Sequence, residues 1–244
     1  MSNPIDIRTP LLRLGRAAAK LESLRGSGGV EDRLFGLWTP PPSGEVLAVG
    51  AQGAALAAAA WARRSGVRLR QLVWGPLTHE ARKALEIWGL PFEHVPSREQ
   101  ALARAQGALP ALDSDEAVAH AAGLVAEVIE ELRIANWTPA ALVAPAGARA
   151  PLLAFARALP DLQIIAVTGP PELPDLAAHD LHGVQLREVS RAFAASARRR
   201  LSREQGLLVS HASAAAIALA EELGGVALVT ANGEREFSLD AEAP

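Results

Sequence analysis

The sequence KLESLRGSGGVEDR, residues 20–33, is the point from which the architecture of the chain can be worked out. A strand-like segment around Leu21 runs into a loop of glycine and serine at residues 26–29. Glycine adopts backbone conformations that other residues avoid, so such a loop permits a tight turn. A helix is predicted to begin in the residues that follow, 30–33. The stretch therefore predicts a strand, a glycine loop and a helix in direct succession.

The same order of elements recurs along the rest of the chain. Gly50 and Gly53 separate a predicted buried strand at 45–49 from a helix of small residues at 54–64, and suit a tight turn with close backbone approach. Thr78, Ser190 and Ser213 are predicted N-caps. The other predicted strands are 67–73, 141–144, 163–167, 184–189 and 226–230, and the other predicted helices are 79–88, 113–132, 152–159, 190–200 and 214–223. Repeated strand–turn–helix alternation predicts a doubly wound, mainly parallel α/β fold.

Composition and charge exclude several classes of protein. Half of the 244 residues are apolar, which predicts a globular chain with a substantial core. The formal net charge of -3 gives no reason to expect nucleic acid or an anionic membrane surface as a partner. Cysteine is absent, which excludes disulfides, thiolate nucleophiles and cysteine-ligated metals. Since no apolar run reaches about 18 residues and the N-terminus lacks the pattern of a signal peptide, the chain is expected to be cytoplasmic.

Residues 20–33 resemble the cofactor-lysine loop of the fold-type II pyridoxal-phosphate enzymes, the group of cysteine synthase, threonine dehydratase and the tryptophan synthase beta chain. The pattern of that loop reads roughly KLES-L/F-NP-x-GS-V-K-D-R. Residues 9–14 resemble the TPLVRL opening of the same family, and residues 49–57 resemble its SGNHGQALA turn. Residues 206–215 and 232–235 continue the match in the same order. The collinearity of these motifs carries the resemblance, because each motif alone is weak.

The resemblance implies a fold and an assembly. It implies two open, mainly parallel sheet-and-helix lobes with a cleft between them. The larger lobe is expected to comprise residues 1–44 and 135–244, and the smaller lobe residues 45–134. A homodimer, or a heterodimer with an active relative, is also expected, because dimers with twofold symmetry are the commonest oligomers.

The cofactor site of the family is altered at several positions. The position of the Schiff-base lysine is Glu31, and a carboxylate lacks the nucleophilic amine that this chemistry requires. The asparagine that contacts the ring hydroxyl corresponds to Ala51, and the GTGGT phosphate loop corresponds to residues 146–150, with one glycine left. The resemblance therefore leads to the prediction that the pyridoxal-phosphate site is lost and that no cofactor binds.

Several residues are nevertheless candidates for a functional site. Glu31 and His211 are the candidates for acid–base catalysis, although a solvated carboxylate near a helix N-terminus and a satisfied polar histidine are the simpler interpretations. No metal site is predicted. The candidate ligand-binding residues, taken from the loops that form the family's site, are Gly50, Gln52, Gly147, Arg149 and Ser213.

Three functions remain open from the sequence. The first is a catalytically inactive relative that binds a small anionic or amino-acid-like ligand, or that regulates an active relative. The second is an enzyme that has rebuilt the site around Glu31, with His211 or Ser213. The third is an active pyridoxal-phosphate enzyme of amino-acid metabolism whose lysine lies elsewhere.

Overall fold

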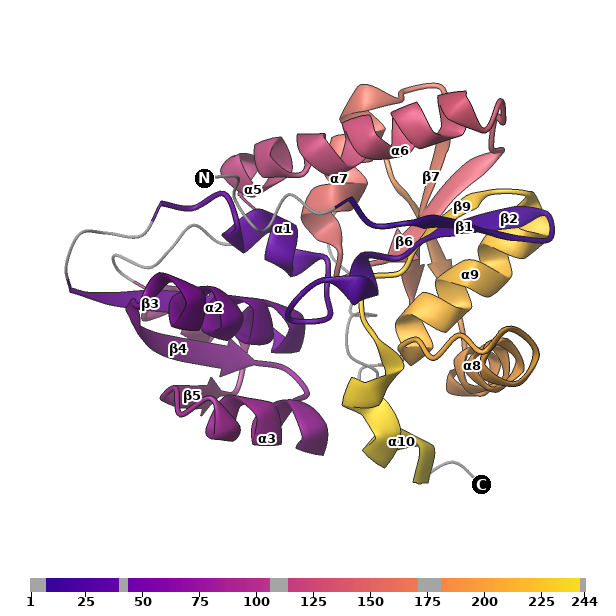
Figure 1. The fold of residues 1–244 in the computed structure, drawn as a ribbon. Coiled ribbons are helices and arrows are strands. Elements are labelled where there is room, and N and C mark those ends of the chain that lie inside the picture. The colour runs from indigo at the N-terminus through magenta and orange to yellow at the C-terminus, as the bar shows by residue number, and fades with distance from the viewer. Residues whose placement is uncertain (1–7, 40–43, 106–113, 171–180, 242–244) are drawn as a thin grey trace.

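The computed structural model describes residues 8–39, 44–105, 114–170 and 181–241, which form two lobes, each built on its own sheet (Figure 1). The larger lobe contains a six-stranded sheet in the order β1-β2-β9-β6-β7-β8. Its strands are β1 (Leu11–Leu14), β2 (Ala17–Lys20), β6 (Ala141–Pro145), β7 (Gln163–Thr168), β8 (Gln185–Glu188) and β9 (Val226–Leu228). The β1–β2 pair is antiparallel and the other neighbours are parallel. The predicted α/β class with mainly parallel sheets is therefore confirmed.

Helices cover both faces of this sheet, as a buried parallel sheet requires. One face carries α5 (Asp115–His120), α6 (Ala122–Ile134) and α7 (Arg149–Ala158), and the other carries α8 (Arg191–Gln205) and α9 (His211–Leu223). Side chains of a strand alternate between the faces. Leu142 and Ile164 accordingly pack in the core under α6 and α7, whereas Val143 and Ile165 pack under α8 and α9.

The smaller lobe is a three-stranded parallel sheet covered in the same way. Its elements are β3 (Glu45–Gly50), α2 (Gln52–Ser65), β4 (Arg68–Trp74), α3 (His79–Ile87), β5 (Phe92–Val95) and α4 (Arg98–Ala103). The helices α2 and α3 pack on one face and α4 packs on the other. Thr78 is the N-cap of α3, because its hydroxyl accepts a hydrogen bond from Ala81 N at 3.3 Å, and this prediction is confirmed.

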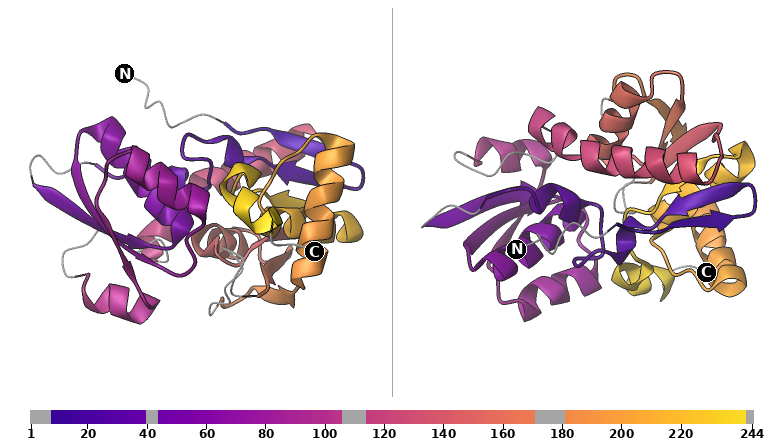
Figure 2. Two further views of the ribbon diagram at one scale, coloured as in Figure 1. Left: turned by 90° about the horizontal axis from the view of Figure 1, so that it is seen from below. Right: turned by 45° about the horizontal axis from the view of Figure 1, so that its top comes forward.

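The short helix α1 (Glu31–Phe35) joins the two lobes. Val30 and Leu34 belong to the core of the larger lobe, whereas Phe35 and Trp38 belong to the core of the smaller lobe. The rings of Phe35 and Trp38 meet edge to face with their centroids 4.4 Å apart. The position of α1 is therefore set by both cores, and Figure 2 shows it at the junction of the lobes from two further sides.

The chain passes between the lobes again at its C-terminal end. After β9, the segment η2 (Gly233–Glu236) and the helix α10 (Phe237–Ala241) contact α3 of the smaller lobe. In Figure 1, α1 and α10 lie at opposite ends of the junction between the lobes. Within the described ranges, the lobes thus contact each other at two separated places.

The structure differs from the predicted elements at residues 113–132, where one long helix was expected. Two helices are present, α5 and α6, because Ala121 N donates to the carbonyls of both Ala117 and Val118 and the helical ladder changes there. Both helices pack on the larger sheet, although the predicted division placed residues 45–134 in the smaller lobe. The division into 1–44 with 135–244 and 45–134 as separate units remains a prediction.

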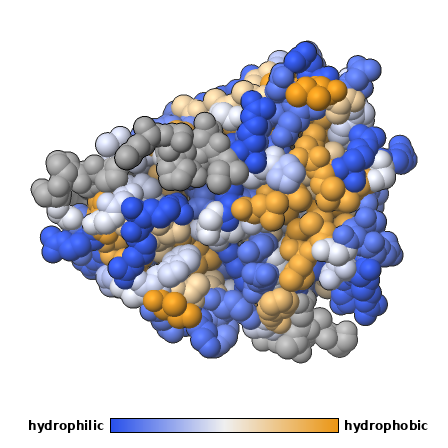
Figure 3. All heavy atoms as spheres, viewed as in Figure 1, coloured by the Kyte–Doolittle hydropathy of each residue, from blue (hydrophilic) through white to orange (hydrophobic). Residues whose placement is uncertain are grey.

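Apolar side chains also reach the surface of the larger lobe. Leu12 on β1 is 39% exposed and Leu223 on α9 is 37% exposed. Figure 3 shows a band of apolar surface across this lobe. None of the helices in the four described ranges combines the length and the apolar character that crossing a bilayer requires.

Candidate functional site

Glu31, the first residue of α1, lies between two glycines from different segments. An ideal Cβ added to Gly53 would lie 2.5 Å from Glu31 Oε1, and one added to Gly29 would lie 2.5 Å from Glu31 Oε2. Both glycines are therefore needed for the observed position of the carboxylate. The structure thus brings the glycine loop, Glu31 and the first turn of α2 together.

The loop that precedes Glu31 packs against the segment that follows β9. Val30 N donates to Thr230 O at 3.1 Å, and Asn232 N donates to Gly28 O at 3.2 Å. A Cβ added to Gly29 would also lie 3.5 Å from a guanidinium nitrogen of Arg235. Arg235 is 8% exposed. The Glu31 carboxylate and the Arg235 guanidinium therefore flank the same glycine, a proximity that the sequence analysis missed.

His211 begins α9 and is held by a carboxylate from η2. Its Nδ1 lies 2.8 Å from Glu236 Oε2, and its backbone N donates to the same oxygen at 2.7 Å. Both side chains are 2% exposed. A carboxylate at a helix N-terminus is also stabilised by the helix dipole. His211 is therefore a buried, carboxylate-oriented imidazole, and Glu236 is a second residue that the pattern alone did not indicate.

Ser213 lies inside the first turn of α9 and does not cap it, in contrast to its predicted role as N-cap. Ser210 is the N-cap, because its hydroxyl accepts a hydrogen bond from Ser213 N at 3.1 Å. The Ser213 hydroxyl accepts from Thr230 N at 3.1 Å and from Ala231 N at 3.3 Å. Ser213 thus fixes the start of α9 to the segment that contacts the Glu31 loop.

The turn after β3 is held mainly by backbone and amide contacts. A Cβ added to Gly50 would overlap Ala54 Cβ, so glycine is required there. Gln52 is 4% exposed, and its Oε1 accepts a hydrogen bond from Thr78 N at 2.8 Å. Gln52 therefore ties this turn to the start of α3.

Gly147 and Arg149 lie where β6 passes into α7. Gly147 is exposed, and Arg149 is the first residue of α7 and half-buried. The pKa of the Asp115 carboxyl lies below its usual value, mainly through the hydrogen bond and charge of Arg157 and further through the charge of Arg149. A cation beside the N-terminus of a ten-residue helix is an arrangement that favours anions.

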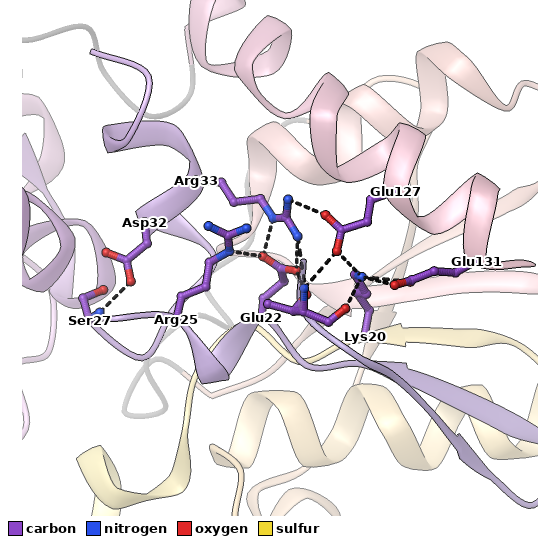
Figure 4. A network of polar contacts seen from close by, with 9 residues as sticks. Lys20, Glu22, Arg25, Ser27, Asp32, Arg33, Glu127 and Glu131 are labelled. Atoms are coloured by element: carbon purple, nitrogen blue, oxygen red, sulfur yellow. Dashed lines mark hydrogen bonds and ion pairs between the residues drawn. The ribbon is translucent and has the colours of Figure 1, made fainter. Parts of the chain in front are cut away.

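A buried cluster of six charged side chains holds α1 from the side of the larger lobe (Figure 4). Its members are Lys20, Glu22, Arg25, Arg33, Glu127 and Glu131. Glu127 uses one oxygen for Lys20 Nζ, at 2.5 Å, and the other for Arg33 Nη1, at 2.8 Å. Arg33 Nε also lies 2.6 Å from Glu22 Oε2. Three cations thus meet three anions, so the cluster balances its charge although it is largely removed from water.

The pKa shifts in this cluster follow from its contacts. Burial raises the pKa of the Glu127 carboxyl, but the hydrogen bonds and charges of Arg33 and Lys20 lower it by more, and its pKa lies below the usual value. Burial lowers the pKa of Arg33, but the hydrogen bonds to Glu22 and Glu127 outweigh this effect and raise it. Glu127 and Arg33 therefore remain ionised at neutral pH, and Arg33 fixes α1 two residues away from Glu31.

Asp32 ties the same helix to the loop and to the smaller lobe. Its Oδ2 accepts a hydrogen bond from Ser27 N at 2.6 Å, and its Oδ1 lies 3.7 Å from a guanidinium nitrogen of Arg64 on α2. Contacts from both lobes thus converge on α1.

No protein-family model and no curated protein sequence matches the chain. Solved structures match it over nearly its whole length. A lysine-to-alanine variant of O-ureido-L-serine synthase with O-ureido-L-serine bound gives a TM-score of 0.79 at 19% identity, covering 98% of this chain and 92% of that chain. The O-acetylserine-dependent cystathionine beta-synthase from Helicobacter pylori gives 0.77 at 20% identity, covering 98% and 97%. O-ureido-L-serine synthase itself gives 0.76 at 20% identity, covering 100% and 96%.

The fold is that of the fold-type II pyridoxal-phosphate enzymes. The resemblance seen in the sequence is thereby confirmed at the level of fold. The prediction that no cofactor binds is wrong, because the matched structures are those of pyridoxal-phosphate-dependent enzymes, which points to pyridoxal phosphate. Altered side chains on three loops do not by themselves show the loss of a site.

The residues present fit the two ends of pyridoxal phosphate differently. Arg149 and the N-terminus of α7 offer the positive charge that a phosphate requires. In the sequence resemblance, Glu31 stands at the position of the Schiff-base lysine. Of the two lysines in the sequence, Lys20 is fully buried among carboxylates and Lys83 is exposed on α3. The start of α7 thus carries a charge complementary to a phosphate, whereas a carboxylate at residue 31 cannot form a covalent link to the cofactor.

Proposed function

We propose that the protein binds a small anionic, amino-acid-like ligand at the junction of its lobes and does not perform the lysine-dependent chemistry of the fold. The observation that carries this proposal is the carboxylate of Glu31, which lies between Gly29 and Gly53. The sequence resemblance assigns residue 31 to the Schiff-base lysine. A carboxylate binds an ammonium group by a charge-assisted hydrogen bond but cannot form an imine.

The ligand class follows from the charges around the site and from the matched structures. Two of the matched proteins are named for O-ureido-L-serine and O-acetylserine, which are O-substituted serines. Such a ligand carries an ammonium group, for which Glu31 is the complementary charge. It also carries a carboxylate, for which Arg149 and the start of α7 are complementary. Pyridoxal phosphate bound at this site would be held by the same anion contacts, without a Schiff base at residue 31.

The proposal also includes assembly. A homodimer, or a heterodimer with an active enzyme of the same fold, is proposed, and in the second case ligand binding would regulate the partner. Twofold symmetric dimers are the commonest closed oligomers, and apolar side chains such as Leu12 are exposed on the larger lobe.

Calorimetric titration with O-acetyl-L-serine and with pyridoxal phosphate tests the ligand. Arg149→Gln is expected to weaken the binding of both ligands by roughly tenfold or more, because one charge-assisted contact is lost. Glu31→Gln is expected to weaken only O-acetyl-L-serine, which carries the ammonium group. Glu234→Gln is the matched control, because Glu234 is exposed and belongs to the neighbouring η2 segment.

Two results would overturn the proposal. The first is turnover of O-acetyl-L-serine by the purified protein with pyridoxal phosphate present. The second is a pyridoxyl adduct on Lys20 or Lys83 after borohydride reduction, measured by peptide mass analysis. Equal binding of both ligands by the Glu31→Gln variant and the wild type would remove the assigned role of Glu31.

A further inference from the structure

The second contact between the lobes, where η2 and α10 meet α3, contains a pair of hydrogen bonds at one carboxylate. Glu80, the second residue of α3, accepts a hydrogen bond from Ser238 N at Oε1 and from Ser238 Oγ at Oε2, both at 2.8 Å. Ser238 is the second residue of α10, which the chain reaches directly from β9 and η2 of the larger lobe. The two residues are 158 positions apart in the sequence. We call this contact the Glu80–Ser238 latch.

The carboxylate is well matched to this place. It lies in the first turn of α3 and binds the first turn of α10, where unpaired backbone N–H groups favour a negative charge. Burial raises the pKa of Glu80, but hydrogen bonds from its own backbone and from Ser238, with the nearby charge of His79, lower it by more. The Glu80 carboxyl group is therefore ionised at neutral pH.

On each side of the latch, hydrogen bonds connect it to a residue of the candidate site. On the smaller lobe, Thr78 caps α3 and donates its backbone N–H to Gln52, next to the turn that faces Glu31. On the larger lobe, Glu236 precedes Ser238 by two residues and holds His211 at both its backbone N and its Nδ1. A shift of α3 relative to α10 would therefore move these two walls of the site apart.

From this geometry we infer that Glu80 is a positioning residue. Through its two bonds to Ser238 it fixes the spacing of the lobes, and thereby the spacing between the Gln52 turn and the His211 end of α9. The effect on ligand affinity rests on the function proposed above. The effect on the spacing of the lobes does not.

The absence of cysteine makes the spacing of the lobes directly measurable. Lys83→Cys on α3 and Ser196→Cys on α8 place spin labels at two exposed positions, one on each lobe. Glu80→Ala and Ser238→Ala are each expected to lengthen the mean distance between the labels and to broaden its distribution in electron double resonance. Glu86→Ala is the matched control, because it removes an exposed glutamate from the same helix.

The same variants are titrated with O-acetyl-L-serine. Affinity is expected to fall about tenfold in Glu80→Ala and less in Ser238→Ala, which keeps the backbone N–H, and to stay unchanged in Glu86→Ala. Longer label distances without any binding by the wild type would support the latch and refute the proposed function. Unchanged label distances in both Glu80→Ala and Ser238→Ala would refute the inference that the latch fixes the spacing of the lobes, whatever the affinity of these variants. If Glu80→Ala fails to fold, the label distances in Ser238→Ala decide whether the latch fixes the spacing of the lobes.

Discussion

Replacing Glu127 by alanine is expected to lower the free energy of unfolding by about 3 kcal/mol. The side chain is 7% exposed, and its oxygens bind Lys20 Nζ and Arg33 Nη1. Removing one partner of a buried ion pair costs about 3–5 kcal/mol, because the remaining charge is left uncompensated. Each cation keeps a second carboxylate partner, so the expected loss lies at the lower end of this range.

A matched control is available on the same helix. Glu130 pairs with Arg133, but these side chains are 39% and 72% exposed. Exposed pairs contribute little to stability, so Glu130→Ala should lower the free energy of unfolding much less than Glu127→Ala does. Both variants change glutamate to alanine within α6, and their effects on helix propensity are similar. Urea unfolding followed by tryptophan fluorescence measures the difference, and equal losses in the two variants would refute the reasoning.

The dependence of stability on pH gives a second measure of the same side chain. The pKa of Glu127 is lower in the folded protein than its usual value of 4.5. Its ionised form therefore stabilises the fold at pH values above 4.5, and this contribution is lost as the pH falls through the lowered pKa. The Glu127→Ala variant is expected to lose less stability than the wild type between neutral pH and this acid range. An equal loss of unfolding free energy on acidification in both proteins would contradict the stabilising role of the ionised Glu127.

Four other predictions concern packing, the site and assembly. Gln71 is 1% exposed, and neither amide atom has a hydrogen-bond partner among the described residues, so Gln71→Met should raise the free energy of unfolding by about 1 kcal/mol; a lower value in urea unfolding would contradict this. Arg198 is 3% exposed and donates to two backbone carbonyls at 2.9 and 2.7 Å, so Arg198→Met should cost about 3 kcal/mol in the same assay. Gly53→Ala should displace the Glu31 carboxylate and weaken O-acetyl-L-serine binding in calorimetry, with less than about 1 kcal/mol of stability lost because the displaced atoms end a flexible side chain. Light scattering at micromolar concentration should show a dimer, and a monomer without a co-purifying partner would end that proposal.

Local sequence patterns predicted the elements of the fold well at positions that favour one kind of residue, such as a hydroxyl at an N-cap or glycine in a tight turn. Thr78 and Ser190 each cap the helix that was expected after them, with hydroxyls 3.3 and 3.1 Å from the backbone N that they bind. Gly50 stands where no Cβ fits. At α9 the same reasoning chose the wrong serine, because Ser210 and Ser213 are both compatible with an N-cap and only the contacts of the segment after β9 distinguish them.

The candidate site could be predicted only in part. Gly29 and Gly53 were predicted as turn residues, but their approach to the Glu31 carboxylate was not. Arg235 and Glu236 were not, since a single charged residue has no periodicity and its partner lies on another segment. The ion cluster shows the same limit: Lys20 and Glu127 are 107 residues apart, and nothing near either of them indicates the other. Which polar residues pair over long distances depends on the topology of the fold. The local sequence pattern predicts the fold class but not these pairs.

The two contacts between the lobes, as far as the described residues show them, differ in how much they bury. At α1, Leu34 and Phe35 are each 2% exposed in separate cores, and the buried ion cluster holds the same helix. The Glu80–Ser238 latch consists of two part-buried hydrogen bonds. Local opening starts where few apolar contacts are buried, so the latch should yield before α1 does. The lobes would then pivot about α1, and Glu31, at the pivot, would keep its place while the Gln52 turn moves away from the His211 end of α9.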